Sequence, residues 1–132
     1  GIVQSEVERF RGRAIRSMGD GFLATFDGPG RALRCASAVR DAVRSLEIEL
    51  RVGVHIGEIE LRGDDIAGLA VVIAQRIQAA AEPGEIVASR TVVDLVAGSG
   101  IGFTDRGAHQ LKGIPGEWQL YALEASHEPN QL

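Results

Sequence analysis

The most constraining feature of the chain is an alternating apolar segment followed by a segment with helical spacing. Every second residue over 50–56 is apolar, which predicts a strand with one buried face: Leu50, Val52, Val54 and Ile56. Apolar residues then recur at helical spacing over 66–80, and Pro83-Gly84 ends that pattern. A strand and a helix that each bury one apolar face favour a sheet covered by helices.

The other segments extend this succession of strands and helices. The sequence predicts the end of a helix at 3–10 and a longer helix over 29–46, with two strands between them within 13–26. It then predicts a strand at 85–90, a short helix at 91–98 whose Thr91 and Asp94 have capping-box spacing, and short strands up to residue 123.

The order of these elements predicts an α+β fold. We expect a ferredoxin-like sheet derived from a βαββαβ arrangement, with the helices packed on one face. That arrangement needs a strand before its first helix, and we expect this first strand to be missing because the chain opens directly into helix. One domain over 1–125 and a polar tail over 126–132 account for the 132 residues.

Composition excludes several classes of function. The net charge of −4 argues against a general grip on nucleic acid or anionic membranes, so we expect neither partner. No apolar run approaches the roughly 20 residues that span a bilayer, and no signal pattern opens the chain. The single cysteine, Cys35, fits a cytoplasmic location, and its place in a helical stripe predicts a core residue rather than a nucleophile or ligand.

Asp20 lies between two glycines, where the two strands within 13–26 meet. Asp-Gly is the preferred chemistry of a two-residue hairpin turn, so a tight turn explains the residue. A metal site is the alternative, because an exposed carboxylate between glycines leaves room for a cation to approach. His55 and Glu58 also suggest a metal pair, but residues three apart on a strand point to opposite faces, so we interpret both as structural.

Three long segments resemble the class III adenylate and guanylate cyclase catalytic domain. RAIRSMGDGFLATFDGPGRALRCASAV (13–39) is similar to its metal-binding hairpin and the following helix. LRVGVHIGEIELRGDDIAGLAVVIAQRI (50–77) is similar to its central strand and active-site helix. PGEIVASRTVVDLVAGSGIGFTDRGAHQLKGIPGEWQLYAL (83–123) is similar to its C-terminal third. The likeness spans nearly all of residues 3–123, and the chain is identified as a member of that family.

The resemblance implies an enzyme that works as a dimer, with sites shared at the interface. Its reaction converts ATP to 3′,5′-cyclic AMP and pyrophosphate by attack of the ribose 3′-hydroxyl, assisted by two Mg²⁺ or Mn²⁺ ions. By this resemblance Asp20 is one of two metal-binding aspartates, and the other belongs to the strand expected before Gly1.

The resemblance also assigns substrate-binding and catalytic positions. Asp65 matches an aspartate that accepts a hydrogen bond from adenine, Arg16 replaces an adenine-selective lysine, and Lys112 matches a lysine near the phosphates. Arg76 matches the arginine of the transition state, and Val72 occupies the place of a transition-state Asn or His. Each charged residue has an ordinary alternative: a helix N-terminal carboxylate for Asp65, and exposed or interfacial cations for the others.

Val72 is the main departure from the family pattern. If the helix already includes Asp65, then Asp65, Val72 and Arg76 lie within about 40° of arc on its surface. Valine has no donor or acceptor, and by analogy with a lost oxyanion donor it raises the barrier by about 3 kcal/mol.

Two functions stay open at this point. The first is an adenylate cyclase domain whose turnover is weak or absent in this chain. The second is a non-catalytic pseudo-cyclase domain that serves dimerisation or nucleotide sensing in signal transduction. The expected partners are ATP and a second cyclase domain, in a homodimer or heterodimer that includes exchange of a strand between subunits.

Overall fold

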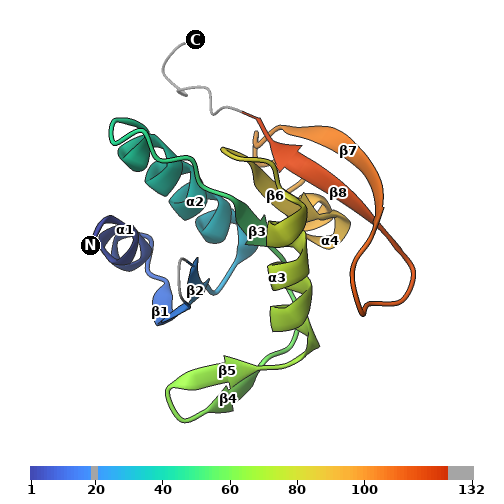
Figure 1. The fold of residues 1–132 in the computed structure, drawn as a ribbon, viewed down its shortest axis with the longest axis horizontal. Helices are drawn as coiled ribbons and strands as arrows, with labels where there is room; N and C mark the ends of the chain where they lie inside the picture. The colour runs from blue at the N-terminus through green and yellow to red at the C-terminus, as the bar shows by residue number, and fades with distance from the viewer. Residues whose placement is uncertain (19–20, 125–132) are drawn as a thin grey trace.

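The computed structural model describes residues 1–18 and 21–124 (Figure 1). The expected turn at Asp20 and the polar tail lie outside these residues. The elements in chain order are α1 (Ile2–Arg9), β1 (Arg13–Met18), β2 (Gly21–Thr25), α2 (Pro29–Arg44), β3 (Val52–Val54), β4 (Glu60–Arg62), β5 (Asp65–Ala67), α3 (Leu69–Ala80), β6 (Ile86–Ser89), α4 (Arg90–Leu95), β7 (Phe103–Gln110) and β8 (Glu117–Leu123).

The strands form one four-stranded sheet and two separate hairpins. The sheet has the order β3-β6-β8-β7, in which β3 and β6 are parallel and the other neighbours are antiparallel. The pairs β1-β2 and β4-β5 are antiparallel hairpins. Figure 1 shows the β4-β5 hairpin projecting from the body of the molecule, below α3. The α+β class predicted from the sequence is confirmed.

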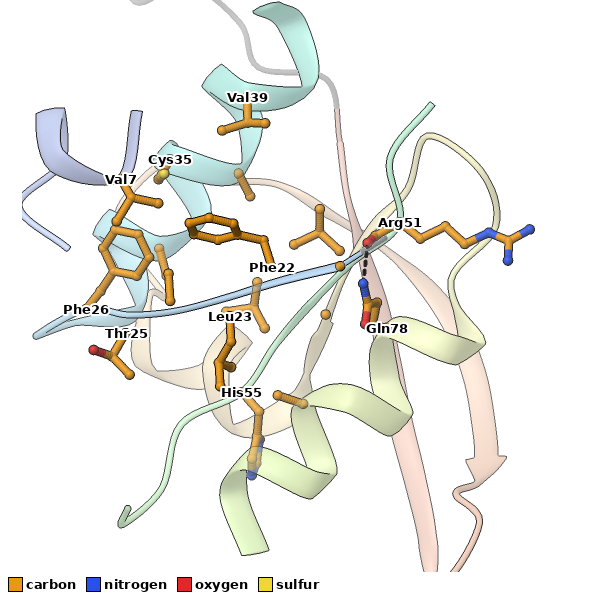
Figure 2. Close-up of a pocket in the computed structure, with 18 of the residues that line it drawn as sticks. Val7, Phe22, Leu23, Thr25, Phe26, Cys35, Val39, Arg51, His55 and Gln78 are labelled. Carbon is orange, nitrogen blue, oxygen red and sulfur yellow. Dashed lines mark hydrogen bonds between the residues drawn. The ribbon is translucent and has the colours of Figure 1, made fainter. Parts of the chain in front are cut away.

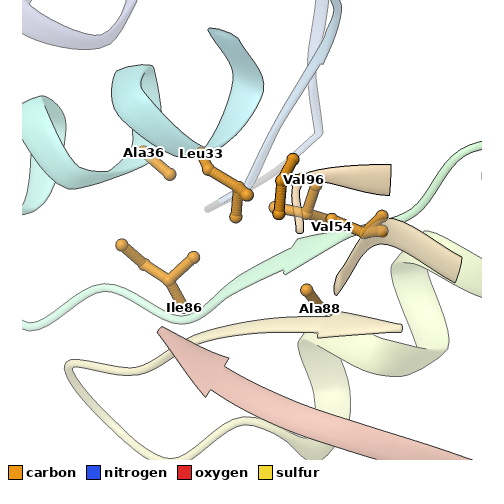
Figure 3. Close-up of a cluster of buried hydrophobic side chains, with 7 residues drawn as sticks. Leu33, Ala36, Val54, Ile86, Ala88 and Val96 are labelled. Atoms are coloured by element: carbon orange, nitrogen blue, oxygen red, sulfur yellow. The ribbon is translucent and has the colours of Figure 1, made fainter. Parts of the chain in front are cut away.

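The predicted placement of the helices on one face of the sheet holds for α2 and α4 but not for α3. Ile86 and Ala88 of β6 belong to an apolar cluster that also includes Leu33 of α2 and Val92 of α4 (Figure 3). The intervening Val87 belongs to a second cluster with residues of α3, among them Ile77. Because adjacent strand residues point to opposite faces, α3 covers the face opposite α2 and α4.

A third apolar cluster joins α1 and α2 to the first hairpin. Its buried members are Val7, Cys35, Val39 and Val43, and half-buried aromatic residues such as Phe22 and Phe26 pack against them. Burial and the nearby Glu6 raise the pKa of the Cys35 thiol to about 11. The thiol therefore stays protonated at neutral pH, and the predicted core role of Cys35 is confirmed.

The predicted start of the third helix is wrong. We expected helix from residue 66, but α3 begins at Leu69, after Gly68 with a φ of 129° that a helix does not allow. Ile66 instead pairs with Leu61 in the β4-β5 hairpin. Ile66 lies in a strand, and its side chain is buried. Its position in the sequence therefore fits the spacing of apolar residues in a helix, although its backbone is not helical.

The predicted capping box at the fourth helix is also wrong. The N-cap of α4 is Ser89, and neither it nor any other side chain makes a capping hydrogen bond there. Thr91 lies inside the helix and is exposed. The Ser89 hydroxyl is buried and is engaged elsewhere, in a hydrogen bond of 2.7 Å with His55 Nδ1. Within the described residues no helix has the length and apolar character needed to cross a membrane.

Gly53 should be essential for the packing of β3 on α3. A Cβ at this position would lie 2.4 Å from the Ala74 carbonyl oxygen and 2.5 Å from the Gln78 backbone nitrogen, closer than packed atoms allow. We expect Gly53→Ala to lower the free energy of unfolding by about 1–3 kcal/mol in urea titrations. Gly30→Ala is the control, because its Cβ would meet only the flexible end of Arg34. An unchanged midpoint for Gly53→Ala would contradict this packing.

His55 should make stability depend on pH. Its ring contacts Ser89 and lies edge-on to Trp118, with 5.5 Å between ring centroids, and burial lowers its pKa from 6.5. The unfolded chain therefore binds a proton at this imidazole more readily than the folded chain does. The free energy of unfolding falls as the pH drops below about 6.5, and it continues to fall until the pH reaches the lowered pKa of the folded state. We expect the melting temperature of His55→Gln to fall less than that of the parent chain between pH 7.5 and 5.5. His109→Gln, at a half-buried histidine of β7 whose Nε2 lies 2.9 Å from the Arg106 carbonyl oxygen, is the control.

Candidate functional site

Helix α3 places two of the predicted site residues side by side. Val72 and Arg76 are four residues apart, so they lie one turn apart on the same flank of the helix. The buried side of α3 is formed by Val71, Ile73 and Ile77, whereas Val72 is only half-buried. The apolar core thus holds α3 in place through its buried side. The flank with Val72 and Arg76 lies outside that core.

A long-range hydrogen bond brings a third predicted residue to this flank. Arg76 Nε donates to the backbone carbonyl of Lys112 over 2.9 Å. Lys112 lies in the loop between β7 and β8, which lines a small hollow of about 560 Å³. The loop and α3 are therefore tied together at Arg76, and the exposed Lys112 belongs to the same region of the surface.

Asp65 occupies a different element from the one expected. It lies in β5, ahead of Gly68 and α3, so the helical arc predicted for Asp65, Val72 and Arg76 does not exist. The Asp65 carboxylate is exposed, and its Oδ1 accepts a hydrogen bond of 2.8 Å from the Ile66 backbone N–H. The alternative of a carboxylate in the first turn of a helix is also wrong, because the residue is in a strand.

Of the two remaining predicted residues, Arg16 belongs to the first hairpin. Asp20 lies outside the described residues. The backbone of Arg16 is in β1, where it pairs with Leu23 after an irregularity between Ala14 and Arg16. Among residues 1–18 and 21–124 no group of three or more His, Cys, Asp or Glu side chains could hold a metal ion.

His55 and Glu58 do not lie on one strand as predicted, since β3 ends at Val54. The structural interpretation of His55 is nevertheless confirmed by its hydrogen bond to the buried Ser89. Glu58 is exposed in the segment that leads to β4. No local sequence pattern indicates the contact between His55 and Ser89, because the two residues lie 34 positions apart.

A groove of about 890 Å³ lies between the first hairpin and the sheet (Figure 2). Its walls come from β2, α2, α3 and the segment around β3, and Arg76, Lys112 and Val72 are not among the lining residues. Figure 2 shows Phe22 and Leu23 of β2 and His55 beside β3 along it. Sequence reasoning missed both this groove and Gln78, which donates from α3 to the Arg51 carbonyl over 3.2 Å.

Comparison with known proteins relates residues 4–125 to one family. They match the model of the adenylate and guanylate cyclase catalytic domain. A protein of Rhizobium meliloti named "Putative adenylate cyclase 3" is 35% identical over 143 residues, which cover 99% of this chain and 24% of that protein. The chain thus spans about a quarter of the length of this relative.

Solved structures give the same relationship. An adenylate/guanylate cyclase/hydrolase from Silicibacter pomeroyi superposes with a TM-score of 0.82 at 32% identity, over 92% of this chain and 77% of the other. An adenylate cyclase of Trypanosoma brucei in its monomeric state has the same TM-score at 18% identity, over 94% of this chain and 76% of the other, and supports the fold alone. The chain therefore belongs to the family of adenylate and guanylate cyclase catalytic domains.

Proposed function

We propose that the chain is an adenylate cyclase domain with weak or absent turnover. In the reaction, the ribose 3′-oxygen of ATP forms a bond to the α-phosphorus and gives up its proton. The bond from the α-phosphorus to the bridging oxygen breaks, and pyrophosphate leaves with the bonding electrons. The choice of ATP is supported by Asp65 and by the likeness to the Rhizobium protein, whose name refers to adenylate.

The observation that carries the proposal is the flank of α3 where Arg76 is held and Val72 lies one turn away. Among the described residues, the Arg76 guanidinium engages the Lys112 carbonyl through Nε. Because a guanidinium has five N–H donors, four N–H groups are left on its terminal nitrogens for phosphate oxygens. A planar donor fixed in this way suits charge that develops on the α-phosphate during the displacement.

Asp65 and Arg16 are proposed to bind the adenine. The exposed Asp65 carboxylate accepts hydrogen bonds, as recognition of an exocyclic amino group requires. Arg16 keeps the positive charge of the lysine that it replaces, but its planar fork is wider than an ammonium group. Lys112, at the loop that holds Arg76, is proposed to attract the phosphates.

The metal chemistry of the family would enter through Asp20. A bound Mg²⁺ or Mn²⁺ would neutralise phosphate charge and lower the pKa of the attacking hydroxyl. One carboxylate is a poor site for a hard cation, which needs several oxygen ligands. The described residues add no further group of three ligands. We therefore expect other carboxylates, in a second chain or in another segment, to complete such a site.

A second candidate function is a pseudo-cyclase domain that binds a partner or a nucleotide without turning it over. Val72 favours it, because an apolar side chain stabilises no developing charge. In a homodimer both sites contain Val72, so symmetry cannot replace the missing donor. A heterodimer with a complete cyclase domain would still form one competent site.

Val72→Asn should restore part of the activity. An amide beside Arg76 supplies the missing hydrogen-bond donor. Because one such donor changes kcat by about 10²–10³-fold, we expect the rate of cyclic AMP formation from Mn-ATP to rise at least about ten-fold. Leu69→Asn is the matched control on the same helix, because Leu69 is 62% exposed and has no proposed role. Both variants belong in a protein that contains the whole cyclase domain. Equal rates for the two variants would show that Val72 does not limit turnover.

Asp65→Ala should weaken ATP binding independently of turnover. Loss of one hydrogen bond to adenine costs about 1–1.5 kcal/mol, so we expect the dissociation constant to rise about ten-fold in calorimetric titrations with an unreactive ATP analogue. Asp64→Ala is the control, because Asp64 is a neighbouring exposed carboxylate with no proposed role. If both substitutions weaken binding equally, the effect is one of general charge and Asp65 does not read adenine.

A further inference from the structure

The carbonyl that Arg76 engages belongs to a tight turn in the loop between β7 and β8. The Ile114 backbone N–H donates to the Leu111 carbonyl over 2.9 Å, which closes a β-turn over residues 111–114. Lys112 and Gly113 are the two central residues of this turn. The peptide bond between them carries the Lys112 carbonyl, so the conformation of the turn decides where this carbonyl points.

The backbone angles identify the turn as type II. Gly113 has a φ of 79°, and a type II turn has a φ of about 80° at its third residue. Lys112 is not among the described residues with a positive φ. This excludes the two mirror-image turn types, because both require a positive φ at the second residue. In a type I turn the third residue has a negative φ, and the central peptide points in nearly the opposite direction.

Apolar packing fixes the turn and the helix relative to each other. Leu111 is buried in the cluster that contains Ile73 and Ile77 of α3, and Ile114 packs against the same cluster. The ends of the turn and the buried side of the helix therefore share one core. The direction of the central peptide then decides whether Arg76 Nε, on the adjacent flank of α3, meets an acceptor.

We propose that Gly113 is a positioning residue for Arg76. Its left-handed backbone turns the Lys112 carbonyl toward Arg76, and this carbonyl accepts the hydrogen bond of 2.9 Å from Nε. The guanidinium is then held in one direction before a substrate arrives, and the entropy of orienting it is not lost during the reaction. The benefit to catalysis rests on the proposed cyclase function, whereas the effect on Arg76 itself does not.

The surroundings of Gly113 allow its backbone conformation to be tested apart from packing. A Cβ at Gly113 would meet no atom within 4 Å beyond its chain neighbours, and the same holds at Gly116, which has a φ of 86°. Alanine at either position therefore introduces similar backbone strain without a clash. Only the peptide before Gly113 carries the carbonyl that Arg76 engages. Asparagine tolerates the left-handed region better than alanine, so Gly113→Asn should keep the type II turn.

NMR spectroscopy of the arginine side chains tests the positioning without any turnover. The Arg76 Nε–H signal is assigned by its loss in Arg76→Lys, and its hydrogen bond slows exchange of this proton with water. We expect Gly113→Ala to speed this exchange about ten-fold or more, because alanine disfavours the left-handed conformation. In Gly116→Ala and Gly113→Asn the rate should stay within about three-fold of the parent chain. An unchanged rate in Gly113→Ala, or an equal increase in Gly116→Ala, would overturn the proposal.

Steady-state kinetics connect the same variants to the proposed reaction. In the Val72→Asn background we expect Gly113→Ala to lower kcat for cyclic AMP formation about three- to ten-fold, with the KM for Mn-ATP within about two-fold, because Arg76 acts in the transition state. Gly113→Asn should recover most of the loss, and a loss that it does not recover would overturn the proposal. If Gly113→Ala frees Arg76 in the spectra but Val72→Asn alone forms no cyclic AMP, the proposed function fails and the positioning of Arg76 stands.

Discussion

Burial of β6 on both faces is the constraint on which the rest of the structure depends. Ile86 and Ala88 are fully buried in one apolar cluster, and Val87, between them, is buried in the other. The parallel pairing with β3 then places Gly53 directly against α3. The orientation of α3, and with it the flank that presents Arg76, therefore follows from the packing of a four-residue strand.

Most helices and long strands could be predicted from the sequence because each has an apolar period that matches its geometry. The exceptions are short elements. Strand β4 has three exposed residues, so no alternation of buried and exposed positions marks it. Its partner β5 contains Ile66, whose spacing from Leu69 and Ile73 fits a helix equally well. The positive φ of Gly68 decides between the strand and the helix, because the helix begins only after this residue. The spacing of apolar residues carries no information about a single backbone angle.

The candidate site was predictable only as a set of residue identities, and these came from resemblance. Their arrangement depends on contacts between distant parts of the chain, which local patterns do not encode. Arg76 and Lys112 meet across 36 residues of sequence, and His55 and Ser89 across 34. The serine also shows how such a contact overrides a local rule, because its hydroxyl serves the histidine rather than the N-terminus of α4.

The candidate site residues differ in how much they contribute to the stability of the fold. A residue that the fold itself requires is weaker evidence for a catalytic role. Arg76 ties α3 to the β7-β8 loop, and Asp65 accepts a hydrogen bond from the backbone of its own hairpin. Both residues thus stabilise local structure whether or not catalysis takes place. Val72 belongs to none of the three apolar clusters, so the fold places little demand on that position. Under the proposed function, the identity of residue 72 would therefore reflect activity more directly than the other two positions, and in this chain that residue is apolar.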